Sequence, residues 1–383
     1  MKLRDWKENY MMDSSLSIKV PGKLMVAGEY AVLSTGYPAI VTAVNRYITI
    51  KISKCDKCKL VTSSETMEAI WSYNHKGAIT GLEGEGYSFI KEAIHIACQY
   101  LRERAIWISP FELHIENGLN DILSGKKYGL GSSAAIVVGV ISAILAYFNH
   151  GMEHDQLKLY KLSCIAHLKS QGNGSGADIA ASVYGGWICY YRYDWSWLNT
   201  RMEDPNVTIT SLLHSLWPGL CIKRVLLPDR MSLLAGWTRC AVKTSPLVEQ
   251  IEAFQRKNTE QYELFLERSK TAVEEFISSC DLGQEAGIIH AIHENRRALQ
   301  YLSNITGIQL ETKELRSLCQ IADQYGASKF SGAGGGDCGI ALLHSLVDIN
   351  TLKQAWEGAG ILPLDIQSAE HGAVIEAKEY ELL

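Results

Sequence analysis

The sequence predicts an α+β protein built from two domains or from one large composite domain. A chain of 383 residues, 47% of them hydrophobic, is long enough to bury two ordinary cores. In each half of the chain, segments with strand-like patterns come first and segments with helical periodicity follow. This grouping favours an α+β arrangement over a doubly wound parallel sheet, in which strands and helices alternate.

The first half begins with strands and continues with helices. β-branched and partly alternating residues predict strands at 15–20, 38–44, 46–53 and 111–117, and Asn45 and Arg46 mark a break between the second and third. Apolar residues recur with helical spacing on one face of the segment 87–104. Two further helices are expected at 133–149 and 154–170.

The second half repeats this order. Residues 193–211 are polar and lack sustained periodicity, so they are predicted to form an irregular junction between domains. Strands follow at 220–228 and 231–238, and three or four helices fill residues 246–325. The chain then closes with a strand, a glycine run, a strand, a helix and a strand, at 327–331, 332–336, 337–343, 348–360 and 361–369.

Charge and hydropathy exclude several classes of partner. The formal net charge is -5, with acidic and basic residues interspersed, which gives no general attraction to nucleic acid or to an anionic membrane. The longest apolar run, Ala134 to Phe148, is shorter than the roughly 20 residues that a membrane-spanning helix needs. The N-terminus lacks a secretory signal and the ten scattered cysteines are typical of a reducing compartment, so we predict a cytoplasmic protein.

A short glycine loop, GLGSSAA at 129–135, precedes the apolar helix. The first turn of a helix carries free backbone N–H groups and a partial positive charge, so a phosphate group fits there. The hydroxyls of Ser132 and Ser133 could add donors or hold a magnesium ion that bridges phosphates. From these residues alone, a plain glycine turn with serine as the helix cap is an equal alternative.

The spacing excludes two common phosphate loops. Lys126 and Lys127 precede the glycines instead of following them, and Ala134 stands where GxGxxG requires its third glycine. Two more glycine clusters, QGNGSGAD at 171–178 and SGAGGGDC at 331–338, favour phosphate binding all the same. Lys23, after a Pro-Gly turn, is a surface residue in the simplest interpretation and a charge clamp if phosphate lies beside it.

These stretches resemble the GHMP family of small-molecule kinases, which includes galactokinase, homoserine kinase, mevalonate kinase and phosphomevalonate kinase. Three family motifs match residues 21–33, 129–135 and 331–339, and the similarity covers residues 17–375. The resemblance implies an N-terminal extension, an ATP-binding domain like ribosomal protein S5 domain 2, and a ferredoxin-like C-terminal domain with extra helices. We place these parts at 1–16, 17–195 and 215–383, with ATP between the two domains.

Within the family, the chain most resembles the bacterial members that act on phosphomevalonate, through residues 126–135, 171–187, 294–302 and 328–342. This resemblance implies transfer of the γ-phosphoryl group of ATP, with Mg²⁺ as cofactor, to 5-phosphomevalonate in the mevalonate route to isoprenoids. One alternative is a related kinase that phosphorylates another small alcohol or phosphorylated acid. A second is a binding protein without activity on the same scaffold. A monomer or homodimer is expected.

The resemblance also implies roles for individual residues. Asp178 matches the catalytic aspartate, and Lys23 matches the lysine that pairs with it and touches the transferred group. Ser133 matches the magnesium ligand. The ATP-binding residues are Lys127, Gly129, Leu130, Gly131, Ser132, Ser133, Ala134 and Ala135. The acceptor side comprises Tyr30, Ser175, Gly176, Ser331, Gly332, Ala333, Gly334 and Gly335.

Two positions depart from the family pattern. Mevalonate kinases carry a glutamate magnesium ligand at a position that falls on His167, so water is expected to take that place. Residues 236–244 read GWTRCAVKT where phosphomevalonate kinases usually read Trp-Thr-Gly-x-Pro-Ala-Ser-Thr. Arg239 and Lys243 thus put two cations in this segment, either in a solvated turn or as a grip on an acceptor anion.

The chemistry of the acceptor favours a positioning role for Asp178. A phosphate monoester has a second pKa of about 6 and is mostly dianionic at neutral pH, so its attack requires no base. We therefore expect Asp178 to position Lys23 and the acceptor. The simpler alternative for this residue is a helix cap beside the GSG turn.

Overall fold

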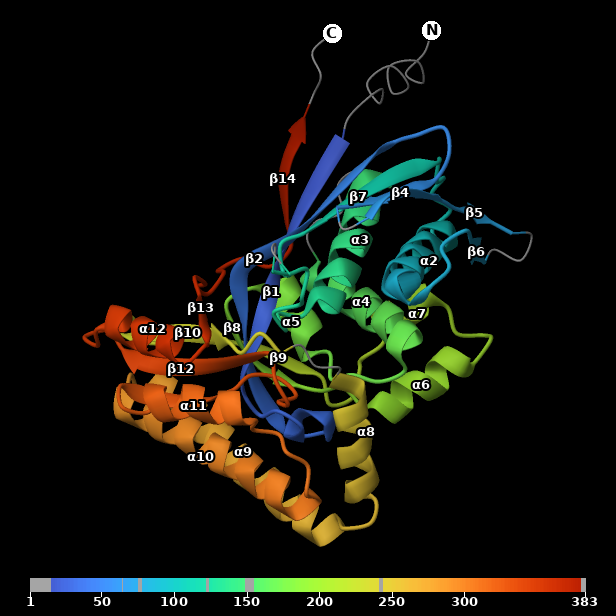
Figure 1. Cartoon of the computed structure of the whole chain (residues 1–383). Coiled ribbons are helices and arrows are strands. Elements are labelled where there is room, and N and C mark those ends of the chain that lie inside the picture. Colours follow the sequence, from blue (N-terminus) through green and yellow to red (C-terminus); the bar gives the residue numbers. More distant parts are fainter. Residues whose placement is uncertain are drawn as a thin grey trace, which may run out of the picture.

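A computed structural model describes residues 15–63, 65–74, 78–121, 124–148, 155–240 and 244–379. Two main sheets, one of eight strands and one of four, lie side by side with helices packed against both (Figure 1). The predicted α+β class is therefore confirmed.

The first sheet is organised around two long strands. β1 (Ser15–Ala27) pairs antiparallel with β2 (Pro38–Lys54) along almost its whole length. The predicted break at Asn45 and Arg46 is wrong, because β2 runs through both residues. The register shifts at this point, because Pro21 of β1 pairs with Tyr47 whereas Gly22 pairs with Val44.

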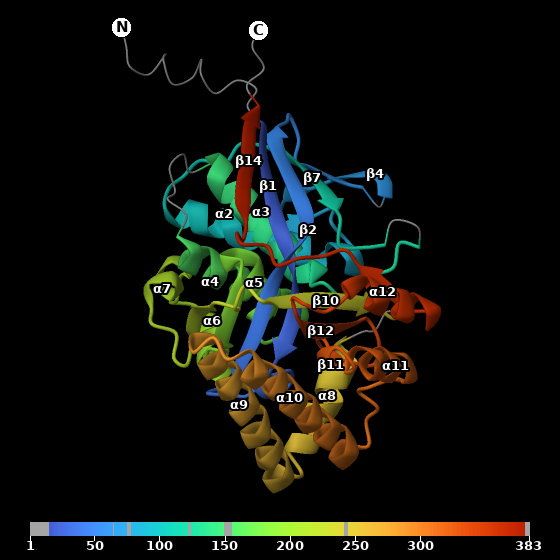
Figure 2. The ribbon, with the colours of Figure 1, turned by 90° about the vertical axis from the view of Figure 1, so that its left-hand side faces the viewer.

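Shorter strands complete this sheet. β8 (Trp187–Tyr191) pairs with the first part of β2 and β7 (Phe111–Asn117) with its last part. β3 (Lys59–Thr62) and β4 (Glu65–Ile70) continue beyond β7, β9 (Cys221–Val225) pairs with β8, and β14 (Val374–Glu379) pairs with β1. The chain beyond residue 215 thus returns twice to the first sheet, and the start of β1 lies beside the end of β14 (Figures 1 and 2).

Four helices cover this sheet: α2 (Ser88–Glu103), α3 (Ser132–Phe148), α4 (Gln156–Gln171) and α5 (Ala177–Tyr184). α3 and α5 pack directly on β1, and α2 and α4 pack on α3. Gly139 lets α3 approach the sheet closely, since a Cβ atom there would lie 2.6 Å from Ile50 Cγ1. The apolar run is thus a core helix, and no helix in the described ranges is long and apolar enough to cross a membrane.

The predicted irregular junction is wrong. Residues 193–211 contain α6 (Trp195–Glu203) and the start of α7 (Ile209–His214). Asp194 caps α6 by accepting a hydrogen bond from the backbone N–H of Trp197, and Thr208 forms a capping box with Ser211. Leu198 is the buried residue of α6, so this helix is too short and too exposed to show a clear periodicity.

The second sheet has the order β11, β12, β10, β13, and its paired strands run antiparallel. Its strands are β10 (Met231–Trp237), β11 (Gly326–Phe330), β12 (Cys338–His344) and β13 (Leu362–Leu364). The helices predicted between β10 and β11 are confirmed. They are α8 (Thr244–Gln255), α9 (Thr259–Asp281), α10 (Glu285–Thr306) and α11 (Lys313–Ala322). The helix predicted after β12 is α12 (Ile349–Gly358). Tyr30, Phe265 and Phe330 share a buried cluster that joins the two parts of the molecule.

Candidate active site

The predicted phosphate loop lies at the N-terminus of α3. Gly129 and Gly131 have φ values of +84° and +78°, where side chains are strained. Space is also restricted, because a Cβ atom on Gly131 would lie 2.9 Å from Lys23 Cγ and one on Gly129 would lie 2.7 Å from Asp337 Cβ. The loop therefore brings the open end of α3 against both the first and the third motif.

Lys23 lies between two of the glycine loops. It is half-buried on β1, and its backbone N–H donates to the Leu130 carbonyl at 2.8 Å. Its Nζ is 4.0 Å from the position that a Cβ atom on Gly332 would take. The aliphatic part of the Lys23 side chain thus lies against the phosphate loop, and its ammonium group lies near the third glycine loop.

Asp178 lies in the first turn of α5, half-buried. Its Oδ1 accepts from the backbone N–H of Ile179 at 3.0 Å. The N-cap of α5 is Gly176, so the interpretation of Asp178 as the helix cap is wrong. Gly176 has φ +81°, and a Cβ atom there would lie 2.9 Å from the hydroxyls of both Tyr160 and Tyr190. Glycine is thus required at this turn by conformation and by space.

His167 and Ser133 connect α4 with the phosphate loop. Ser133 Oγ is 3.4 Å from His167 Nε2, and the His167 ring packs 4.9 Å from the ring of Phe89. Burial lowers the pKa of His167, and the negative charge of Asp178 opposes this shift. Burial thus favours the neutral imidazole of His167, the position that we expected to match the glutamate of mevalonate kinases.

Two side-chain contacts tie the first motif to the third, and a further contact ties the first motif to β11. The Tyr30 hydroxyl donates to the Ala333 carbonyl, and the Ser331 hydroxyl donates to the Met25 carbonyl at 2.9 Å. Lys329 forms an ion pair with Glu29, and both side chains are almost completely buried. The contacts from Tyr30 and Ser331 hold the predicted acceptor-side residues in place. Sequence reasoning missed the ion pair, although a charge within each apolar stretch was a visible signal.

Ser175 and the remaining glycines of the third loop have mainly conformational roles in this structure. Ser175 Oγ accepts from the backbone N–H of Ala177 at 3.2 Å, which supports the turn before α5. Gly332, Gly334 and Gly335 all have φ values between +72° and +86°. Since this is the left-handed region, the loop can follow its tight path only with glycine at these positions.

Arg239 lies beside the residues that lead into the phosphate loop. It is exposed, its φ is +62°, and its carbonyl accepts from Lys126 Nζ at 3.5 Å. Hydrogen bonds from Ser124 lower the pKa of Asp121, and the charge of Arg239 adds to this effect. Lys127 is exposed in the same segment. Lys243 lies outside the described residues.

Two cavities of the described structure lie away from these loops. A cavity of about 410 Å³ is lined by parts of α3, α4, α5 and β9 and by the segment that enters β14. A smaller one of about 260 Å³ lies at α10, α11 and Phe330. Neither is lined by residues of the three glycine loops, so the candidate active site is identified by its converging groups and not by cavity volume.

Comparison with known proteins identifies related sequences and structures. The family model of the GHMP kinases N terminal domain matches residues 88–186, and that of the GHMP kinases C terminal region matches residues 276–362. A phosphomevalonate kinase of Streptomyces sp. (strain CL190) is 33% identical over 92% of this chain and 96% of its own length.

Solved structures show the same relationship. The Lin0012 protein from Listeria innocua is 38% identical with a TM-score of 0.88, and the match covers 95% of this chain and 100% of that one. Streptococcus pneumoniae phosphomevalonate kinase in complex with phosphomevalonate and AMPPNP is 30% identical with a TM-score of 0.79, covering 92% and 99%. The resemblance read from the motifs and the fold that it implied are confirmed: the chain belongs to the GHMP kinase family.

Proposed function

We propose that this protein is a kinase that transfers the γ-phosphoryl group of ATP to the phosphate of 5-phosphomevalonate. An oxygen of the acceptor phosphate attacks the γ-phosphorus, the bond from that phosphorus to the β,γ-bridging oxygen breaks, and ADP and 5-diphosphomevalonate leave. The position of Lys23 between the phosphate loop and the third glycine loop carries the proposal, because the transferred group must lie between donor and acceptor. The kinship with phosphomevalonate kinases supports the choice of acceptor.

The groups of this chain supply alignment and charge. The N-terminus of α3, from Gly129 to Ala135, binds the ATP phosphates through backbone N–H groups and the helix dipole. Lys23 offsets negative charge that builds up between donor and acceptor. Asp178 orients Lys23 and the acceptor instead of removing a proton, since the attacking phosphate is already dianionic.

We also propose that Mg²⁺ accompanies the nucleotide. Magnesium prefers oxygen ligands and is usually held by one or two protein groups together with substrate phosphates. The Ser133 hydroxyl fits that role at the end of α3, whereas His167 beside it offers a nitrogen. In the described ranges, no group of three or more His, Cys, Asp and Glu side chains could hold a metal ion. When bound, the ion would neutralise phosphate charge.

We assign the acceptor side to Tyr30, to the turn before α5 and to the third glycine loop, which lies near Lys23. Tyr30, Ser175, Gly176 and the segment 331–335 would shape this side mainly through their backbone, because the Tyr30 and Ser331 hydroxyls are engaged within the protein. Arg239 would contribute a cation for an acceptor anion, with Lys243 as its partner in the same segment. Its place in a divergent segment favours the second candidate function, a related kinase with another phosphorylated acid as acceptor. The oligomeric state and a cytoplasmic location stay predictions.

The test is a comparison of acceptors. The protein is incubated with ATP, magnesium and either phosphomevalonate, mevalonate, homoserine or galactose, and ADP release and product mass are measured. We expect ADP release and a diphosphate product with phosphomevalonate alone. Turnover with another acceptor would identify the related kinase, and nucleotide binding without turnover on any acceptor would point to a binding protein.

A further inference from the structure

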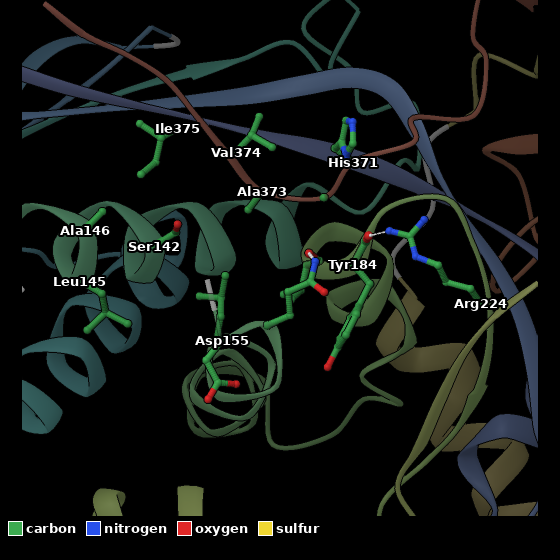
Figure 3. Close-up of a pocket in the computed structure, with 14 residues that line it drawn as sticks. Ser142, Leu145, Ala146, Asp155, Tyr184, Arg224, His371, Ala373, Val374 and Ile375 are labelled. Carbon is green, nitrogen blue, oxygen red and sulfur yellow. Dashed lines mark hydrogen bonds between the residues drawn. The ribbon is translucent and has the colours of Figure 1, made fainter. Parts of the chain in front are cut away.

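The cavity of about 410 Å³ has the size of a small-molecule site, although it lies outside the active site. Figure 3 shows its two ends. Leu145, Ala146 and Ile375 lie at one end in this view, and Arg224 and His371 lie at the other. The cavity therefore combines an apolar end with a polar end.

The polar end carries a net positive charge. Arg224 is exposed and donates from Nη2 to the Tyr184 carbonyl at 2.9 Å, a bond that uses one of its five N–H groups. The carboxylate of Asp155, also in the cavity wall, is paired with Lys158 Nζ at 2.9 Å. Because this pair is compensated, the guanidinium of Arg224 dominates the electrostatic character of the site.

The apolar end exposes side chains that folding normally buries. Val374 and Ile375 are 36% and 37% exposed, although both are β-branched residues at the start of β14. Ile375 lies on the same side of the view as Leu145, and Leu159 also lines the cavity. Covering these groups with a hydrocarbon chain would remove apolar surface from water.

We propose that this cavity binds a small amphipathic anion, with a carboxylate or phosphate head group at Arg224 and a hydrocarbon chain between Leu145 and Ile375, and that the bound anion regulates turnover. The regulatory part rests on the proposed kinase function.

The helices that line the cavity connect it to the active site. α5 ends at the cavity with Val183 and Tyr184 and begins with the turn that holds Asp178. Its eight residues span about 12 Å. α3 likewise contributes Ser142 and Leu145 to the cavity and carries Ser133 in its first turn. A ligand that shifts either helix along its axis moves a group of the active site.

Calorimetry on the full chain tests the binding site without any substrate. The probes are octanoate and hexyl phosphate, with octanol and octylamine as the neutral and cationic counterparts. We expect both anions to bind, and octylamine to bind at least about 10-fold more weakly than octanoate. Equal affinity for octanoate and octylamine, or no heat from either anion, would overturn the proposal.

Two variants locate the ligand. Arg224→Gln should weaken octanoate binding by about 10-fold and leave octanol unchanged, whereas Arg230→Gln, at an exposed arginine outside the cavity, should change neither. Ile375→Ser should weaken both ligands by about threefold or more, with Leu346→Ser, 88% exposed, as its control. Unchanged octanoate affinity in Arg224→Gln would remove the assigned head-group position.

Turnover in the presence of octanoate tests regulation. We expect saturating octanoate to change kcat or the KM for ATP by about fivefold in the wild type and not in Arg224→Gln at the same concentration. Binding with unchanged kinetics would overturn the regulatory part. The calorimetric experiment uses no substrate, so it tests anion binding even if phosphomevalonate is not phosphorylated. Failure of the binding proposal can therefore be distinguished from failure of the proposed kinase function.

Discussion

The buried pair of Glu29 and Lys329 makes a quantitative prediction about stability. Lys329 is completely buried and Glu29 is 3% exposed, and they join the first motif to β11 across 300 residues of sequence. Removal of one partner leaves an uncompensated charge in the interior, at a cost of about 3–5 kcal/mol in the free energy of unfolding. A domain is stable by about 5–15 kcal/mol, so Glu29→Gln should be strongly destabilised.

A double-mutant cycle separates the interaction energy of the pair from the effects of each single substitution. In Glu29→Gln combined with Lys329→Met, neither buried charge is left, and most of the lost stability should return because apolar replacements of buried pairs are often neutral. Urea unfolding followed by circular dichroism gives all four free energies. The matched control is Glu376→Gln at the exposed pair with Lys19, where the change should be below about 1 kcal/mol.

The pH dependence of the free energy of unfolding provides a second test of the pair. Burial lowers the pKa of Lys329, and Glu29 opposes that shift. In Glu29→Gln the folded protein should therefore bind fewer protons than the unfolded chain above neutral pH, so the free energy of unfolding should rise with pH toward the ordinary lysine value. We expect a steeper rise from pH 7 to pH 9 than in the wild type. Equal slopes, or a double variant as unstable as Glu29→Gln, would refute a coupled buried pair.

Three further predictions concern the active site. Asp178→Asn should lower kcat by at least about 100-fold with nearly unchanged ATP affinity; turnover at the wild-type level would reject its role. Ser133→Ala should raise the magnesium concentration needed for half-maximal rate, and an identical titration would count against Ser133 as ligand. Arg239→Gly should raise the KM for the acceptor by about 10- to 100-fold and leave the KM for ATP unchanged. The same substitution should raise the free energy of unfolding by about 1 kcal/mol. Unchanged kinetics would mean that Arg239 belongs to a surface turn without a role in binding.

Local patterns predicted most of the fold and the tight turns of the candidate site. α2, α3 and α4 carry clear helical or apolar runs, and their expected ranges agree with the structure within a few residues. The glycine motifs correctly indicated tight turns, because glycine is required wherever the backbone turns left-handed or approaches another segment closely. Such requirements are local and therefore visible in sequence.

Features that depend on topology were not predictable in this way. β14 is a strand because β1 offers it an edge, and the pairing joins residues more than 350 positions apart. The partnership of Glu29 with Lys329 is equally remote, and a lone charge in an apolar stretch does not name its partner. α6 was missed for a different reason, since one buried leucine gives no periodicity.

The backbone conformation of Arg239 is strained, and this strain supports a functional role for its side chain. Its φ of +62° lies in the left-handed region, where a residue with a side chain costs about 1–2 kcal/mol relative to glycine. Backbone bonds hold this geometry: the Thr238 N–H donates to the Asp337 carbonyl and the Asp337 N–H donates to the Cys240 carbonyl. An exposed arginine gains little for the fold at such a site, so its cost is explained if the guanidinium binds an anion during turnover. Replacement by glycine should then improve stability and impair acceptor binding, and only a functional role predicts opposite signs for the two effects.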